Sequence, residues 1–196
     1  MLRHHRDELL PATLDFAAEF DATLIIIFSF SRGGAPPGDP PGEVLECLYQ
    51  AAERTSAAGM SLAIETEEGF WADTGERSAQ LVRAVGHTAL GINWDPGNSF
   101  CAGDEPYPEG YAHVRELVRH VHFKDARREA DGEPVYALEG EVDWAGQIAA
   151  LVKDGYRGHV SIETHLRPKV STAHDSLERL RDLLARAETS AATAST

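Results

Sequence analysis

The apolar positions of this chain fall into short continuous runs that alternate with longer stretches of helical spacing. The short runs are rich in β-branched residues and predict strands that are covered on both faces. The longer stretches carry apolar residues three and four positions apart, as amphipathic helices do. The predicted strands are 22–30, 61–65, 90–95, 120–123 and 159–163, and the predicted helices are about 5–20, 43–58, 74–85, 107–119, 143–154 and 172–187. This alternation predicts an α/β fold with a parallel sheet and right-handed crossovers.

Glycine, proline and polar segments separate these elements. The segment 31–42 holds four prolines and four glycines, which predicts a loop. We expect Thr74 or Asp73 to cap the helix that follows and Gly86 to end it. The charged segment 125–140 is predicted as another loop. Residues 189–196 are only Ala, Ser and Thr and predict a disordered tail, which leaves 1–188 as a single domain.

The composition narrows the classes of partner. The chain has 196 residues, of which 42% are hydrophobic, and this is enough for one sizeable core. A formal net charge of −14 disfavours nucleic acid and anionic membranes as partners. Cys47 and Cys101 form no spacing motif and favour a reducing compartment. Since the N-terminus is polar and the most apolar run, 23–30, is too short to span a bilayer, we expect a cytoplasmic protein.

Four residues with metal-ligating side chains stand at the ends of predicted strands: Glu65, Asp95, His122 and Glu163. The carboxyl ends of parallel strands share one face of the fold, so we expect these side chains to converge. Three carboxylates with one imidazole favour a divalent ion such as Mn²⁺, Mg²⁺, Co²⁺ or Zn²⁺. A single glutamate at a strand end is more often a solvated or capping residue. Four residues with metal-ligating side chains, each at the end of a different strand, instead predict a metal-dependent enzyme for a small polyhydroxylated substrate.

Two of the predicted ligands are glutamates, which adds an acid–base function to the site. A glutamate near a metal can act as a general base, and two from different strands can remove and return a proton from opposite sides. We expect only one of His120 and His122, which flank Val121, to face this site.

Five motifs lie in order along the chain: LAIE at 62–65, GINWDPGN at 91–98, HVHFKD at 120–125, EGEVDW at 139–144 and GYRGHVSIE at 155–163. With these motifs the chain resembles the xylose-isomerase-like TIM-barrel superfamily of sugar and sugar-phosphate isomerases and epimerases, over about residues 13–184. The resemblance implies a TIM-barrel-like fold, here a partial (β/α) barrel of about five parallel strands with outer helices. It does not identify the substrate.

The resemblance also implies roles for individual residues. Glu65, Asp95, His122 and Glu163 match the metal ligands, and Glu65 and Glu163 match the pair that transfers a proton through a metal-stabilised enediolate. The candidate substrate-binding residues are Asn98, Lys124, Arg128 and Trp71. Asn98 replaces a histidine of the ketose epimerases, which argues against a close relationship to them. Asp125 is expected to orient His122 or to cap a loop.

The chain departs from the superfamily in its strand count. A full barrel has eight strands and typically about 250 residues, whereas the first three strands have no counterpart here. The strand at 22–30 would then form an apolar edge, which is an aggregation liability. Three explanations are open: a fragment or late start, a second copy that covers the open edge as a homo-oligomer, or an open sheet under the N-terminal helix.

The leading hypothesis is therefore a metal-dependent isomerase or epimerase of a small sugar, sugar phosphate or related hydroxy-carbonyl compound. The alternatives are a lyase or dehydratase on the same scaffold and a non-catalytic truncated-barrel subunit. A phosphodiesterase of the apurinic-endonuclease type needs more metal ligands than the sequence offers, and the acidic charge argues against DNA.

Overall fold

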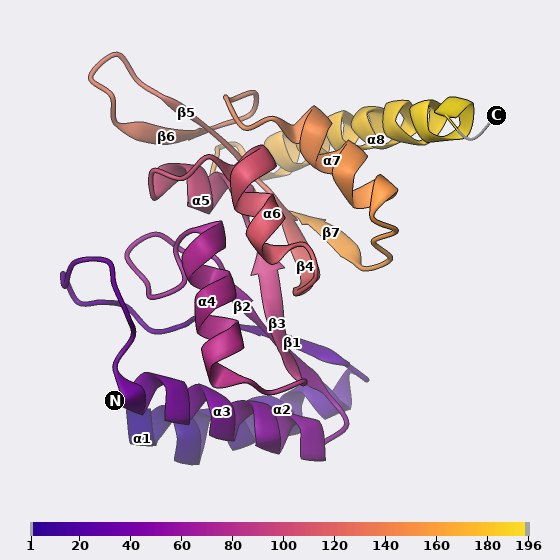
Figure 1. Cartoon of the computed structure of the whole chain (residues 1–196). Helices are drawn as coiled ribbons and strands as arrows, with labels where there is room; N and C mark the ends of the chain where they lie inside the picture. The colour runs from indigo at the N-terminus through magenta and orange to yellow at the C-terminus, as the bar shows by residue number, and fades with distance from the viewer. Residues whose placement is uncertain (1, 195–196) are drawn as a thin grey trace.

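The computed structural model describes residues 2–194 and contains a five-stranded parallel sheet of order β1-β2-β3-β4-β7 (Figure 1). The strands are β1 (Leu24–Ile27), β2 (Ser61–Glu65), β3 (Leu90–Trp94), β4 (Val118–Phe123) and β7 (His159–Ile162). Every neighbouring pair in this sheet is parallel. The sheet curls into part of a barrel but does not close, because a closed barrel of this kind has eight strands. The predicted parallel α/β architecture is confirmed.

Helices connect the strands and cover the outer face of the sheet. They are α1 (Leu2–His4), η1 (His5–Leu9), α2 (Leu10–Glu19), α3 (Gly42–Ala57), α4 (Gly75–Val85), α5 (Pro96–Cys101), η2 (Pro106–Gly110), α6 (Tyr111–Val114), α7 (Trp144–Lys153) and α8 (Lys169–Ala194). The first three follow one another without a break and correspond to the helix predicted for 5–20. Helix α3 packs on β2, α4 on β3, and α8 on β7 and α7.

The ends of helix α4 follow the predicted chemistry. The Thr74 hydroxyl accepts a hydrogen bond from the backbone N–H of Arg77 at 3.2 Å, so Thr74 rather than Asp73 is the N-cap. At the other end Gly86 adopts a left-handed conformation with φ 68° and accordingly terminates the helix.

The prediction of a loop over 125–140 is wrong. Strands β5 (Asp125–Arg128) and β6 (Pro134–Ala137) pair there as an antiparallel hairpin, which projects from one end of the molecule in Figure 1. Much of this hairpin is exposed and charged, so it lacks the apolar alternation by which a half-buried strand is recognised.

The predicted helix over 107–119 is also too long. Tyr107 is extended, with φ −141° and ψ 131°, and only α6 is regular before β4 begins at Val118. Tyr107 precedes Pro108, and a residue before proline is disfavoured from helical conformation. The predicted strand 22–30 likewise shortens to β1, and Phe30 has a positive φ of 71°.

The predicted disordered tail 189–196 is wrong up to Ala194, because α8 continues to that residue; residues 195–196 lie outside the described residues. Alanine has the highest helix propensity. In addition, the hydroxyls of Thr189, Ser190 and Thr193 donate to carbonyls four residues earlier and so stay satisfied within the helix.

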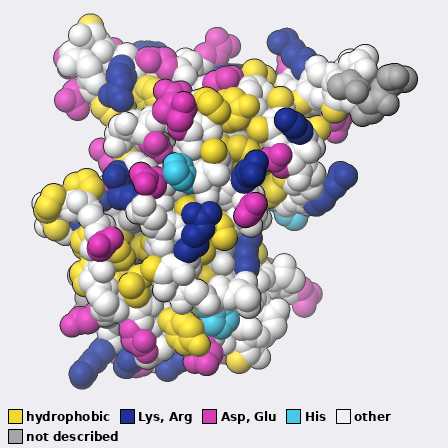
Figure 2. Space-filling view, viewed as in Figure 1, with side chains coloured by type: hydrophobic (Ala, Val, Ile, Leu, Met, Phe, Trp, Pro, Cys, Tyr) yellow, Lys and Arg dark blue, Asp and Glu magenta, His cyan; other side chains and the backbone are white. Residues whose placement is uncertain are grey.

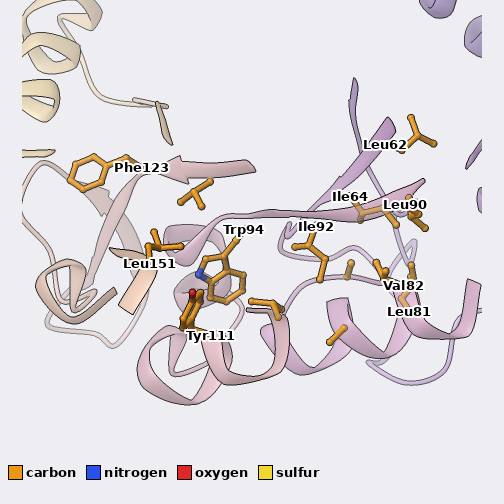
Figure 3. Packing of buried hydrophobic residues seen from close by; sticks show 14 of the residues in the cluster. Leu62, Ile64, Leu81, Val82, Leu90, Ile92, Trp94, Tyr111, Phe123 and Leu151 are labelled. Carbon is orange, nitrogen blue, oxygen red and sulfur yellow. The ribbon is translucent and has the colours of Figure 1, made fainter. Parts of the chain in front are cut away.

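The core lies between the outer face of the sheet and the helices (Figure 3). Figure 3 shows Trp94 beside Tyr111, with Ile92 further along the same strand. Trp94 is fully buried and its indole N–H donates to Gln147 Oε1 of α7 at 2.8 Å. The carboxyl end of β3 is therefore held in place by packing and by a buried hydrogen bond.

Apolar side chains remain exposed around β1 and the helix before it. Phe16 of α2 and Phe20, the residue after this helix, are 66% and 69% exposed, and Phe28 after β1 is 49% exposed. An apolar groove of about 440 Å³ lies between the N-terminal helices, β1 and α3. Ile26 of β1 is 37% exposed, so the predicted apolar edge is present.

The surface agrees with the acidic composition. Figure 2 shows acidic and basic side chains interspersed over the face in view rather than gathered into one basic patch. Among the helices of residues 2–194, none combines the length and the apolar character that crossing a bilayer requires.

Candidate metal centre

The four residues predicted as metal ligands converge at the carboxyl ends of the strands. Glu65 ends β2, Asp95 follows β3, His122 lies in β4 and Glu163 follows β7. Nδ1 of His122 is 3.3 Å from Glu65 Oε1, 3.6 Å from Asp95 Oδ2 and 3.2 Å from Glu163 Oε2. One ligand atom from each residue lies within 4.8 Å of those of the other three. The strands thus bring together side chains that are up to 98 residues apart in sequence.

Asp95 is held by the turn that follows it. It is fully buried, and its Oδ1 accepts the backbone N–H of Asn98 at 2.9 Å, which caps α5. A Cβ at Gly97 would lie 2.6 Å from the carbonyl oxygen of Lys124, so only glycine lets α5 approach β4 this closely. Residues 96–98 form the start of a short helix, and capping this helix fixes the position of the Asp95 carboxylate.

Two atoms of the cluster lack the hydrogen bonds that burial normally requires. Among the described residues, Asp95 Oδ2 and His122 Nδ1 are buried without a hydrogen-bond partner. Lys124 Nζ lies 3.0 Å from Asp95 Oδ2 as an ion pair, but it is not aligned as a donor. Oxygen and imidazole nitrogen donors that face one another suit a divalent cation. The residues therefore fit a divalent metal, which Glu65, Asp95, His122 and Glu163 would hold.

The electrostatics of the cluster agree with this fit. Burial lowers the pKa of His122, but the carboxylates of Asp95, Glu163 and Glu65 outweigh it and raise that pKa to about 11. Contacts with His122 and Lys124 hold the pKa of Glu163 well below its usual range, although burial acts in the opposite direction. Burial raises the pKa of Asp95, against the effects of His122 and Lys124. Without a metal, the imidazolium and the ammonium supply the positive charge that the carboxylates require.

Asn93 supports His122 from behind and was not predicted. Its side-chain amide lies 3.2 Å from Nε2 of His122, and its Oδ1 is buried without a partner. If Nδ1 faces the metal, Nε2 carries the proton, and turning the amide over would place Oδ1 as its acceptor. Asp125, by contrast, accepts the backbone N–H groups of Ala126, Gly140 and Val142 and so caps a loop rather than orienting His122.

Of His120 and His122, only His122 belongs to the ligand cluster, as expected, although both side chains point to the same face of β4. Residues two apart in a strand point to the same face, and the two rings lie 5.5 Å apart. His120 Nε2 shares a hydrogen bond of 2.8 Å with Ser161 Oγ, one layer below the cluster.

Two of the four predicted substrate-binding residues border the cluster. Lys124 is buried, and its Nζ donates to Glu163 Oε2 at 2.6 Å. Asn98 is fully buried, and its Nδ2 lies 3.5 Å from Glu65 Oε1.

The structure does not bring the other two to the cluster. Trp71 lines a small pocket with residues 38–40 and the exposed side of α4. Arg128 is exposed, and its guanidinium lies over the ring of Phe100, 5.0 Å from the centroid. Within residues 2–194, neither Trp71 nor Arg128 forms a hydrogen bond, an ion pair or a ring contact with any of the four ligands.

Three further residues border the site without having been predicted: Glu67, Tyr136 and His165. Burial raises the pKa of Glu67 to about 7, opposed by Lys124 and reinforced by Glu65, Asp95 and Glu163. The ring of Tyr136 stacks on His165 at 4.8 Å, and Lys124 Nζ lies 5.0 Å from its centroid. The sequence could have indicated Glu67, because it stands two residues after Glu65. No feature of the sequence indicated Tyr136, because it lies in the hairpin that was not predicted.

An open parallel α/β barrel with a carboxylate–imidazole cluster at the ends of its strands defines a protein of the TIM-barrel class with a candidate metal centre. The family model described as xylose isomerase-like TIM barrel matches residues 3–183. The chain therefore belongs to this family.

One curated relative is the rhizopine catabolism protein MocC of Rhizobium meliloti, which is 28% identical over 156 residues. That match covers 68% of this chain and 47% of the relative, so the chain spans about half the length of the protein it matches.

Solved structures share the fold at lower sequence identity. A xylose isomerase-like TIM barrel protein from Mycobacterium smegmatis in complex with magnesium matches with a TM-score of 0.73 and 22% identity, covering 91% of this chain and 66% of that one. An L-ribulose 3-epimerase matches with a TM-score of 0.76 and 16% identity, over 96% and 70% of the two chains. The probable 3-DHS dehydratase AsbF from Bacillus anthracis gives a TM-score of 0.74 and 21% identity, over 89% and 69%. These likenesses show the fold.

Proposed function

We propose that this chain is a metal-dependent isomerase or epimerase of a small sugar or related hydroxy-carbonyl compound. The observation that carries the proposal is the placement of two glutamates on opposite sides of one cluster. Glu65 comes from β2 and Glu163 from the end of β7, with β3 and β4 between these strands. Both carboxylates nevertheless lie within 3.3 Å of the same His122 nitrogen.

This placement suits proton transfer next to a carbonyl group. One glutamate removes the proton from the carbon beside the carbonyl, and the other returns a proton from the opposite side. A bound divalent cation would stabilise the negative charge that develops on the substrate oxygen. Lys124, which contacts Glu163, keeps that carboxylate ionised and ready to accept a proton. The similarity of the fold to an L-ribulose 3-epimerase and to a probable 3-DHS dehydratase supports this proposal.

Hydrogen exchange tests this proposal directly. The Mn²⁺-loaded protein is incubated in D₂O with a panel of ketoses, and deuterium next to the carbonyl is followed by NMR. We expect incorporation with at least one ketose, and its loss in both Glu65→Gln and Glu163→Gln. Glu129→Gln, an exposed carboxylate in the β5–β6 turn, is the matched control. A broad panel without exchange would instead favour a non-catalytic subunit.

A dehydratase is the second candidate, and Lys124 favours it. Its ammonium lies 2.6 Å from Glu163 Oε2, which places an acid beside a base. Glu163 would take the proton next to the carbonyl while Lys124 protonates the departing hydroxyl as water. Loss of water from the product, measured by mass spectrometry, distinguishes this reaction from isomerisation.

We also propose that a second copy of the chain covers the open edge beside β1. The exposed apolar side chains there support this, since closed symmetric dimers are the commonest way in which one chain buries such a surface. Sedimentation velocity over a range of concentrations tests it, and a monomer throughout would contradict it.

A further inference from the structure

The β5–β6 hairpin brings Tyr136 to the candidate metal centre. The Tyr136 hydroxyl donates to Asn98 Oδ1 at 2.9 Å, and its ring stacks on that of His165. Asn98 is fully buried, and its Nδ2 donates to Glu67 Oε2 at 2.7 Å. Through Asn98, the hairpin is therefore joined to the loop that follows β2 and the candidate ligand Glu65.

Helix α8 holds the ends of this hairpin through a single side chain, Arg179. Its guanidinium lies 2.7 Å from Oδ2 of Asp125, where β5 begins, and donates to the carbonyl of Leu138, directly after β6, at 2.9 Å. The guanidinium also lies over the ring of Phe123, 5.5 Å from its centroid. Arg179 stands 41 residues after Leu138, so a distant part of the chain ties the two ends of the hairpin together.

Asp125 makes this contact necessary. Its side chain is only 1% exposed, and its oxygens also accept the backbone N–H groups of Ala126, Gly140 and Val142. A carboxylate buried to this extent requires a cation, and among residues 2–194 only Arg179 forms an ion pair with it. A guanidinium presents several donors in a fixed plane, so it can serve the Asp125 carboxylate and a carbonyl together.

The rest of the hairpin offers few other polar anchors. Its tip is exposed, and its ion pair between Arg127 and Glu129 and the hydrogen bond from Arg128 to the Gly132 carbonyl stay within the hairpin. Helix α5 contacts the strands of the hairpin on one side. The placement of the hairpin therefore depends on α5 together with Arg179 of α8.

We propose that Arg179 is a positioning residue of the candidate site, which holds the β5–β6 hairpin so that Tyr136 stays against Asn98 and His165. Arg179 acts through Asp125 and the hairpin, whereas the strands that carry the four candidate metal ligands are paired with one another. Its loss should therefore displace Tyr136 and leave the ligand cluster in place. The effect on a substrate rests on the proposed function, but the placement of Tyr136 does not.

Fluorine NMR tests the placement of Tyr136 without a substrate. The full metal-free chain is labelled with 3-fluorotyrosine, and of its five tyrosine signals the one that Tyr136→Phe removes is assigned to Tyr136. We expect Arg179→Gln to shift or broaden this signal and to leave the other four in place. Arg179→Lys keeps a charge opposite Asp125 and should displace the signal less. Arg181→Gln, which removes an exposed guanidinium paired with Glu178 on the same helix, is the matched control and should change none of the signals.

The proposal is overturned if the Tyr136 signal is unchanged in folded Arg179→Gln. It is equally overturned if all five signals move together, because that result indicates a general loosening of the fold. Urea unfolding followed by circular dichroism shows which variants are folded. If Arg179→Gln does not fold, the same two criteria are applied to Arg179→Lys.

The deuterium-exchange assay gives the consequence for the site. With a ketose that exchanges, Arg179→Gln should raise KM by about tenfold and leave kcat within about threefold, because the ligands and the glutamate pair keep their positions. An unchanged KM contradicts a role of Arg179 in the site. A wild-type protein that exchanges no ketose contradicts only the proposed function, since the fluorine signal of Tyr136 does not depend on turnover.

Discussion

The central strands and the β1 edge belong to one sheet but differ sharply in how they are covered. Every residue of β3 is buried, whereas Ile26 of β1 is 37% exposed. Strand β3 has a partner on each side and helix α4 across its outer face, while β1 pairs only with β2. Three of the four candidate ligands lie at the ends of β2, β3 and β4, so most of the site is built on the buried central strands of the sheet. Burial here follows the number of neighbours rather than the hydrophobicity of the strand.

The largest effect is expected at the centre of the site. Asp95→Asn should keep the cap of α5, because an amide oxygen can still accept the Asn98 N–H, but it removes a charged metal ligand. We expect Mn²⁺ affinity to fall by at least about 100-fold, measured by titration calorimetry. Glu129→Gln is the control, and an unchanged affinity in Asp95→Asn would mean that the cluster is not the metal centre.

A matched pair of isoleucines measures the difference in coverage. Ile92→Ala in β3 should cost about 2–5 kcal/mol, since the residue is fully buried and leaves a cavity. Ile26→Ala in β1 should cost less than about 1 kcal/mol, because the side chain is already partly exposed. Urea unfolding of the two metal-free variants gives both values. Equal costs would indicate that the β1 edge is covered in solution.

The charge on His122 gives a smaller effect with a defined direction. Its pKa of about 11 in the metal-free fold lies above the ordinary value of 6.5. The raised pKa stabilises the metal-free protein fully below about pH 6.5, and this contribution is lost as the pH rises through about 11. Because a metal needs the neutral ring, Mn²⁺ binding at pH 7 should release about one proton. Calorimetry in buffers of different ionisation enthalpy counts this proton, and no release would contradict the assignment.

The smallest effect on folding is expected at the exposed aromatic pair at the end of α2. Phe16 and Phe20 contact each other, with ring centroids 4.9 Å apart, and are mostly exposed. Phe20→Glu should change the free energy of unfolding by less than about 0.5 kcal/mol, yet shift the sedimentation profile toward monomer if a second copy covers this region. Glu19→Gln on the same helix is the control. An unchanged profile would place any self-association elsewhere.

The sequence predicts the parts of this fold that depend on local pattern. The β-branched runs mark the strands, Thr74 marks a helix start and Gly86 a helix end, because each of these acts through its nearest neighbours. The four ligands could be placed together because parallel strands bring their carboxyl ends to one face whatever the sequence between them. Their convergence within 4.8 Å needed no knowledge of loops.

The parts that failed depend on contacts between distant and polar segments. The β5–β6 hairpin brings Tyr136 into contact with Asn98, 38 residues away in sequence. The hydrophobic periodicity of a sequence does not predict a contact of this kind. Asn98 was correctly placed beside the site, but its hydrogen bonds to Glu67 and Tyr136 show that it serves the protein rather than a ligand. Trp71 and Arg128 were assigned through the resemblance, which does not show the direction in which a loop side chain points.

The two oxygens of Asp95 separate folding from chemistry within a single side chain. One oxygen caps α5 and the other faces the cluster. A natural descendant with asparagine at this position would retain the helix and the fold while losing the charged ligand. The residue at position 95 therefore offers a way to sort relatives of this chain. Those with aspartate can retain the metal centre, and those with asparagine would have kept the fold after losing the metal site.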